Sequence, residues 1–232
     1  MRITPESGGA HIVLLGAFNP PIFRPEWFAA NGILGKDDAA SANVELLHTT
    51  ISVFSLSWGR IAIDQKRFAA DATVPPFVRV RDLVVCTFKQ YLMHTPIYHI
   101  GINRTVHFNV SSFEARDKIG RLLAPQTTWG EWGKQIAGPL DDRRKRGGMV
   151  SLSMSQMARP DGLQGRITAK IEPSPLFVER GIFMDINDHY AVGEPDDILG
   201  AEPAMHIIEE QWEKSIARSE WIVDQIMALD VP

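Results

Sequence analysis

Length, composition and charge place the chain among globular proteins and exclude several other classes. It has 232 residues, 44% of them hydrophobic and 22% charged, which suffices for a sizeable core in one large domain or two small ones. The net charge of -4 disfavours a protein that mainly binds the nucleic-acid backbone, because such domains are usually basic. The single cysteine, Cys86, excludes a disulfide framework and a multi-cysteine metal site within one chain.

The sequence also sets the expected cellular setting. The apolar run 12–18 is too short for a secretory signal peptide, and it leads into Pro20 and Pro21. No run approaches the roughly 18–20 apolar residues that a membrane-spanning helix needs. We therefore expect a cytoplasmic protein without membrane association, and we expect neither a metal ion nor a cofactor.

Hydrophobic periodicity predicts alternating strands and helices in the first half of the chain. The segment 77–94 has apolar residues every three or four positions, as an amphipathic helix does. Gly59 separates two runs that are rich in β-forming residues, which predicts a hairpin. The expected order is strand, helix, two hairpin strands, helix and strand, at residues 11–18, 25–30, 44–58, 60–68, 77–94 and 98–110.

The segment 98–110 gives the clearest signal. Its even positions are apolar apart from Arg104, and its odd positions are mostly polar, including His99, Asn103, Thr105 and His107. Such alternation indicates an antiparallel strand with one buried face. Because the run far exceeds the usual strand length of roughly 5–6 residues, we expect it to be a central strand.

The second half reads as a helix, an irregular stretch, three strands and a long helix. Ser111 and Ser112 precede an acidic first turn, which is typical of a helix start. The stretch 126–148 has no clear periodicity. The strands and the last helix are expected at 150–155, 166–171, 177–186 and 204–229.

Together these elements predict an α+β fold in two halves of similar size. Residues 1–110 have the β-α-β-β-α-β order of a ferredoxin-like arrangement, and residues 111–232 have the order α-β-β-β-α. We expect each half to be an antiparallel sheet covered on one side by helices, and the halves to pack as one globular unit. A homodimer is a further expectation, through the last helix or through an edge strand.

The polar faces of two predicted strands form the main candidate binding site. Asn103 and His107 lie on the polar face of 98–110, and Ser151 and Ser153 alternate with apolar residues after position 150. If two sheets turned these faces toward each other, the side chains would line a groove for a ligand. The alternative interpretation is a hydrated sheet face with no function.

Other reactive residues favour structural interpretations. Asp185 and His189 would lie about 13 Å apart on a strand, which argues against a shared metal ion. The pair Asn187-Asp188 instead predicts the turn that ends this strand. Cys86 lies at the edge of a helical apolar stripe, which favours a small buried residue over a nucleophile. We assign no catalytic residue, because phosphate-loop, zinc-protease, nucleophile-elbow and dinucleotide motifs are all lacking.

The sharpest charge feature is a basic run at Arg143, Arg144, Lys145 and Arg146. A basic loop could contact nucleic acid or an acidic partner, with Trp129 and Trp132 stacking on bases or anchoring that partner. The alternative interpretation is a solvated loop, because two aspartates precede the run and two glycines follow it. On that interpretation the tryptophans cover the edge of a core.

Three sequence features, which follow one another along the chain, allow a comparison with a known family. An N-terminal apolar run ends in Asn19-Pro20-Pro21, the central strand carries Ile100-Gly101-Ile102-Asn103-Arg104, and a strand ending in Met184-Asp185-Ile186-Asn187 precedes an acidic loop and a long helix. This order resembles a sporadically distributed family of uncharacterised bacterial proteins of about this size. That family tends to have Arg-Tyr where this chain has Asn103-Arg104. The resemblance covers nearly the whole chain and implies an architecture but no activity.

The lack of a catalytic motif, together with small polar residues on the strands, favours a non-enzymatic module that binds a protein partner or a ligand. One alternative is an enzyme or small-molecule binder with a groove between the two sheets. A second alternative is a nucleic-acid-associated accessory protein that uses the loop Arg143–Arg146.

Overall fold

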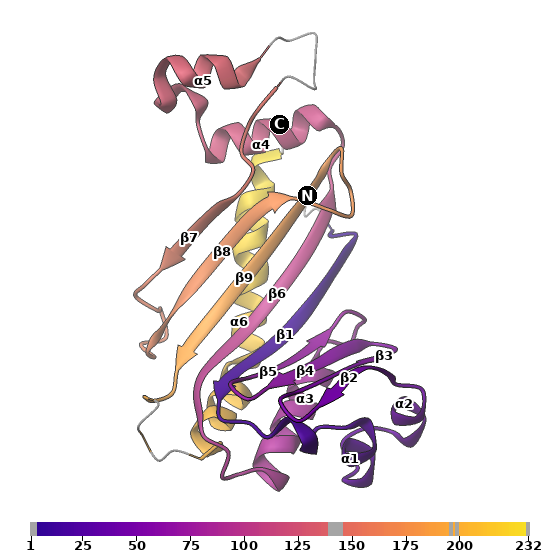
Figure 1. Ribbon diagram of the computed structural model, residues 1–232. Coiled ribbons are helices and arrows are strands. Elements are labelled where there is room, and N and C mark those ends of the chain that lie inside the picture. The colour runs from indigo at the N-terminus through magenta and orange to yellow at the C-terminus, as the bar shows by residue number, and fades with distance from the viewer. Residues whose placement is uncertain (1–3, 139–145, 195–196, 198–199, 231–232) are drawn as a thin grey trace.

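The computed structural model describes residues 4–138, 146–194, 197 and 200–230. Nine strands form one antiparallel sheet in the spatial order β2-β3-β4-β5-β1-β6-β9-β8-β7, and α6 runs behind it (Figure 1). The strands are β1 (Ser7–Gly16), β2 (Asn43–His48), β3 (Ile51–Leu56), β4 (Gly59–Asp64), β5 (Arg67–Ala72), β6 (Ile97–Asn109), β7 (Leu152–Gln156), β8 (Gly165–Pro173) and β9 (Gly181–Ala191). The helices are α1 (Pro25–Ala30), α2 (Lys36–Ala40), α3 (Val78–Cys86), α4 (Phe113–Leu123), α5 (Gly130–Ala137) and α6 (Glu202–Met227).

Strand β6 lies at the centre of the sheet, as the alternation at 98–110 predicts. It pairs in antiparallel fashion with β1 on one side and with β9 on the other. Its even-numbered apolar side chains, such as Ile100, Ile102 and Phe108, are buried beneath the helices. Burial of each contributes about 1.5–3 kcal/mol to folding. The predicted central strand is therefore confirmed.

The α+β class is confirmed, but the separate sheets expected for the two halves are not found among the described residues. Because β6 pairs with β1 and with β9, the strands of both halves join into one sheet. Only the core is divided in two: the buried apolar side chains beneath the helices form two clusters. Helix α6 contributes Ile208 and Trp212 to one cluster, and Val223 and Met227 to the other. No helix in the described part of the chain is long and apolar enough to cross a membrane.

The hairpin predicted at Gly59 is present as β3 and β4, and it is part of a four-stranded meander. The runs 44–58 and 60–68 each contain a turn, so that β2, β3, β4 and β5 follow one another in the sheet. In the turn between β4 and β5, the Asp64 carboxylate accepts the backbone N–H groups of Lys66 and Arg67 at 2.7 and 2.9 Å. An aspartate that satisfies the backbone in this way favours a reversal. The ferredoxin-like order of the first half therefore does not hold.

Two strands are longer than the sequence predicts. Strand β1 begins at Ser7, and Gly9 permits this because a Cβ there would lie 2.8 Å from the Ala72 carbonyl oxygen. Strand β9 continues through Asn187 and Asp188 to Ala191, so the turn predicted at this pair is wrong. Cross-strand pairing to both β6 and β8 outweighs the local turn preference of these two residues.

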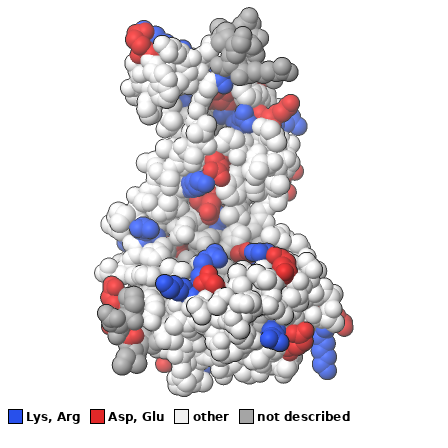
Figure 2. Space-filling view, viewed as in Figure 1, with Lys and Arg blue, Asp and Glu red and all other residues white. Residues whose placement is uncertain are grey.

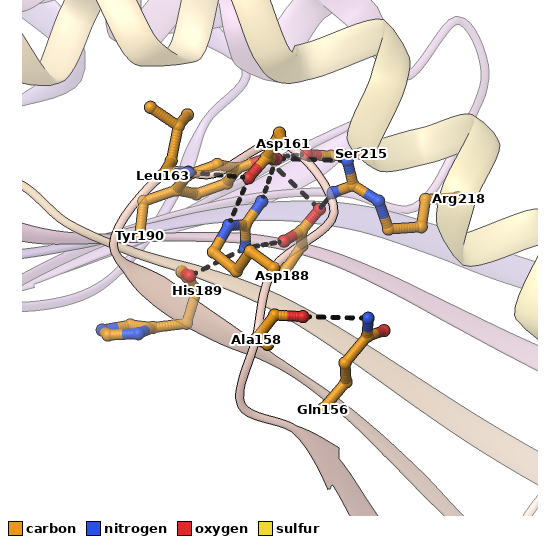
Figure 3. A network of polar contacts seen from close by, with 10 residues as sticks. Gln156, Ala158, Asp161, Leu163, Asp188, His189, Tyr190, Ser215 and Arg218 are labelled. Atoms are coloured by element: carbon orange, nitrogen blue, oxygen red, sulfur yellow. Dashed lines mark hydrogen bonds and ion pairs between the residues drawn. The ribbon is translucent and has the colours of Figure 1, made fainter.

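A buried ion cluster lies between β9, α6 and the loop 157–164 (Figure 3). Asp188 is fully buried and accepts hydrogen bonds from both Arg159 and Arg218. Asp161 accepts from the same two guanidinium groups, at 2.6 Å from Arg159 and 3.2 Å from Arg218. The cluster therefore ties the loop and the long helix to one strand of the sheet.

The cluster compensates for the burial of its charges. Burial alone would raise the pKa of Asp161, but the hydrogen bond from Arg159 brings it below its ordinary value. Burial would likewise lower the pKa of Arg159, yet the bonds to Asp161 and Asp188 raise it. The Arg159 guanidinium also lies over the Tyr190 ring at 3.8 Å, which adds a cation–π contact. Arg159 and Asp161 therefore stay charged near neutral pH.

We predict that Asp188→Ala destabilises the protein by about 3–5 kcal/mol, because it removes the more deeply buried of the two carboxylates that Arg159 and Arg218 share. Urea unfolding followed by circular dichroism measures this change. Asp185→Ala is the matched control, since Asp185 lies on the same strand but on the opposite face. It should not lower the free energy of unfolding, because burial disfavours the charged form of Asp185 and raises its pKa. Equal effects of the two substitutions would contradict a stabilising role for the cluster.

Candidate binding surface on the open face of the sheet

The face of the sheet opposite α6, here called the open face, is turned toward the viewer in Figures 1 and 2. Residues that pair directly across antiparallel strands point to the same face. The registers of all neighbouring strands therefore define one row of polar residues that crosses the entire sheet on the open face. Its members are Asn43, Ser55, Arg60, Asp71, His11, Asn103, Asn187, Thr168 and Ser155.

In the middle of this row, His11 joins an acid on one side to a hydroxyl on the other. Its Nδ1 lies 2.9 Å from Asp71 Oδ1, and its Nε2 lies 2.9 Å from Thr105 Oγ1. Because a carboxylate only accepts, Nδ1 carries the hydrogen in the neutral ring, and Nε2 accepts from the hydroxyl. Three strands, β5, β1 and β6, position this chain of hydrogen bonds.

Next to His11, the neighbourhood of Gly101 contains polar atoms whose hydrogen-bonding capacity is not used. The enclosed atoms Nδ1 of His99, Oδ1 of Asn103 and Nδ1 of His189 have no hydrogen-bond partner among the described residues. The Asn103 side chain is only 9% exposed, and its amide lies over Gly101, where a Cβ would be 3.3 Å from Oδ1. Buried polar side-chain atoms are usually paired, so three orphans on two adjacent strands are unusual.

The histidine rings form the rim of this neighbourhood. His99 on β6 and His189 on β9 pack with their ring centroids 5.1 Å apart and their planes inclined by 37°. Burial lowers the pKa of His189, and the adjacent His99 and Arg166 lower it further. The lowered pKa favours the uncharged form of His189, and the two packed rings offer ring surface together with nitrogen atoms.

Asp185 supplies an acidic group on the same face. It is paired across the sheet with Thr105 on one side and Lys170 on the other. Burial raises the pKa of Asp185, although His11 and Lys170 partly oppose this effect. No hydrogen bond or ion pair joins its carboxylate to another described residue. We call the set His11, His99, Asn103, Thr105, Asp185 and His189 the central patch.

The structure brings together some of the residues that the sequence suggests for a binding site. Asn103, His107 and Ser153 all lie on the open face, whereas Ser151 precedes β7 and is exposed. His107 is engaged, with Nδ1 2.9 Å from Ser174 Oγ and its ring 4.6 Å from that of Phe183. The predicted groove between two facing sheets is not found among the described residues, because these side chains belong to one sheet, with Ser153 three strands away from β6.

The other sequence candidates lie away from the central patch. Trp129 and Trp132 are exposed at α5, with ring centroids 5.4 Å apart, so they do not cover a core edge. Arg143, Arg144 and Lys145 lie outside the described residues, and Arg146 is half-buried and has an interaction partner. Asp185 and His189 are on the open face, but Asp188 is on the covered face. Among the described residues, no three acidic, histidine or cysteine side chains could hold a metal ion.

A cavity of about 350 Å³ lies near α4, at the end of the molecule away from the meander. Its floor includes Ile119, Ile171 and Ile182, and Arg116 and Arg146 are at its rim. Arg116 donates to the Val178 carbonyl oxygen at 2.8 Å, and Arg146 is also engaged. The cavity therefore lacks the unused polar groups that distinguish the central patch.

No protein-family model and no curated protein sequence matches this chain. The residues and their geometry therefore carry the functional argument.

The sequence predicts only some residues of the central patch. The alternation at 98–110 places His99, Asn103 and Thr105 on one face, but nothing local to His11 indicates that it joins them. The period-two pattern of Gly9, His11, Val13 and Leu15 is the one available signal, and the neighbouring glycines obscure it. His189 was missed because a turn was expected where β9 continues.

We predict that the free energy of unfolding decreases as the pH falls below 6.5. Burial lowers the folded-state pKa of both His107 and His189 from the ordinary value of 6.5. Between the folded values and 6.5 the unfolded chain binds more protons, so stability is complete above 6.5 and is lost as the pH falls through the folded pKa values. Chemical denaturation at a series of pH values measures this slope.

The double substitution His107→Gln with His189→Gln should flatten the slope between pH 6.5 and the folded pKa values. His206→Gln on the exposed surface of α6 is the control, and it should leave the slope as it is. A slope that persists in the double variant would show that other groups carry the pH dependence.

Proposed function

We propose that the protein is a non-enzymatic binding module that recognises its ligand on the open face, at the central patch. The observation that carries the proposal is the group of three enclosed polar atoms without partners, contributed by His99, Asn103 and His189. Leaving a buried polar group unpaired costs about 1–3 kcal/mol. A fold that accepts this cost on two neighbouring strands is best explained by hydrogen bonds that come from outside the chain.

The chemistry of the central patch favours a compact, uncharged ligand rich in hydrogen-bonding groups. The patch combines the Asn103 amide, imidazole nitrogens and the Asp185 carboxylate, so it can both donate and accept. Figure 2 shows acidic and basic side chains interspersed over this face, with uncharged areas between them. A polyanion would find no continuous positive surface here, which disfavours the nucleic-acid alternative at this site.

We predict that Asn103→Leu weakens binding of a neutral polar compound by about tenfold, since one direct hydrogen bond is worth about 1 kcal/mol or somewhat more. The measurement is an NMR titration of the labelled protein with sugars, nucleosides and small amides. Asn109→Leu is the matched control, because Asn109 lies on the same strand and face but outside the central patch.

The same pair of variants has a second readout that does not need a ligand. Leucine has nearly the shape of asparagine, so Asn103→Leu removes an unpaired buried polar group and should stabilise the free protein by about 1 kcal/mol. Asn109→Leu should change stability by less than about 0.5 kcal/mol. Failure of every compound class to bind, or equal binding by both variants, would refute the proposal.

A second candidate function is supported by the hydrogen-bond chain from Asp71 through His11 to Thr105. This order of acid, imidazole and hydroxyl is the arrangement in which histidine takes a proton from a nucleophilic oxygen. The candidate ranks below binding because Thr105 Oγ1 is a hindered secondary hydroxyl on a central strand, and it also lies 3.4 Å from the Gly9 carbonyl oxygen. If the chain is catalytic, acyl transfer to Thr105 is the reaction that this geometry supports.

Hydrolysis of an activated ester, p-nitrophenyl acetate, distinguishes the two functions. A catalytic relay predicts saturable turnover that falls at least about 100-fold in His11→Gln, since general-base catalysis contributes at least that much. His48→Gln is the control, because His48 is an exposed histidine on the edge strand β2. Turnover that is absent, or equal in the two variants, leaves the non-enzymatic function.

A further inference from the structure

The two edges of the sheet differ in how they are protected against pairing with another strand. At the β2 edge, the register shifts between Val44 and Leu46, and such a bulge disrupts further pairing. Glu45, at this bulge, is held by Arg60 at 2.9 Å and by a bond from Ser55. A charged side chain on an irregular edge strand is a common way to keep other strands away.

The β7 edge has none of these features. The strand Leu152–Gln156 contains no charged residue and no proline, and its pairing to β8 runs without a register shift. No described element lies along its outer side in Figure 1. Its outward backbone groups therefore present a regular row of donors and acceptors to which another extended strand can pair.

The side chains of β7 also leave apolar rows of the covered face unfinished. Leu152 continues the row of Ile171 and Met184, and Met154 continues the row of Ala169 and Ile186. Met184 and Ile186 are fully buried, whereas Met154 at the end of its row is 68% exposed. The apolar layer beneath the helices thus opens to solvent at β7, and only a neighbouring strand with apolar residues on the same side would close it.

We propose that β7 pairs in antiparallel fashion with β7 of a second copy of this chain, which forms a dimer with one continuous sheet. A two-fold axis perpendicular to the sheet relates the copies, so both covered faces lie on the same side. With Ser153 at the axis, Leu152 of each copy meets Met154 of the other on the covered side, and the two Ser153 residues meet on the open face. The apolar layers of the two copies become continuous.

A second copy fits this edge better than a strand from another protein for two reasons. The partner strand must be uncharged and must have apolar residues on the covered side with small polar residues on the open side. Strand β7 itself has this pattern, with Leu152 and Met154 on one side and Ser153 and Ser155 on the other. Self-pairing also places no like charges opposite each other, which would oppose association. The dimer does not depend on ligand binding at the central patch.

Multi-angle light scattering and analytical ultracentrifugation test the proposal. The wild-type chain should have twice the monomer mass of 25.9 kDa at micromolar concentrations. Met154→Lys should give the monomer mass, because a lysine on the edge opposes pairing. Leu46→Lys is the matched control, since it adds the same charge at an exposed apolar position of the other edge strand, and it should remain a dimer.

A cross-linking experiment gives an independent readout if Met154→Lys perturbs the fold. In a Cys86→Ser background, single cysteines at positions 152 to 156 should form disulfide-linked dimers, with one position near the axis far ahead of the others. A cysteine at position 46 should not. A monomer at all concentrations, a dimer that survives Met154→Lys, or cross-linking through position 46 alone would overturn the proposal. If the chain dimerises only when a peptide from another protein is added, the β7 edge binds that peptide and not a second β7, which also overturns the proposal.

Discussion

The pairing of β6 on both of its sides is the constraint on which the rest of the structure depends. Because strand side chains alternate with a period of two, a slip of one residue would exchange the two faces of the strand. Such a slip would move Ile102 and Phe108 into solvent and place Asn103 beneath the helices. The buried even-numbered residues hold the register. That register in turn sets the polar row on the open face, so the core determines where His11, Asn103 and Asn187 meet.

Buried polar atoms without partners are concentrated on the open face, although Oε1 of Gln211 on α6 also lacks a partner among the described residues. On the covered face, Asp188 has two guanidinium partners, and the hydroxyl of Tyr190 lies 2.6 Å from that of Ser215. This network is largely complete, as a structural network must be if it is not to destabilise the fold. On the open face, the groups around Gly101 are close to one another but do not bond to one another. Incomplete pairing in an otherwise consistent structure is expected at functional sites.

Local sequence patterns predicted the elements better than their assembly. The alternation at 98–110 and the Ser112 start of α4, where the Ser112 hydroxyl accepts from Ala115 N–H at 3.1 Å, depend on neighbouring residues and were predicted. The single sheet was not predicted, because β6 pairs with β1 and β9, which are distant in sequence, and no local pattern indicates such pairing. The turn at Asp64 was missed for a different reason. Its side chain looks like an ordinary polar strand residue until its bonds to the following amides are seen.

The candidate site shows the same division. Asn103 and His107 were predicted for the correct face, since both belong to one periodic segment. His11 and His189 were not, because their relation to Asn103 is set by the registers of β1 and β9 with β6. The prediction that Ser151 lies on a strand face was wrong for a local reason, because β7 starts one residue later, at Leu152. When a site is assembled from several strands, the sequence pattern predicts which residues of one strand share a face. It does not predict which strands lie next to each other.

The course of α6 has a consequence for how the chain can be divided. One helix, which follows all the strands of the sheet along the chain, supplies side chains to both apolar clusters, and the ion cluster joins it to β9. Neither cluster is complete without the side chains of α6. A fragment ending after β6 would also expose the backbone edge that β9 normally occupies, and it would be prone to aggregate. Removing α6 would therefore leave both apolar clusters and the ion cluster incomplete at once.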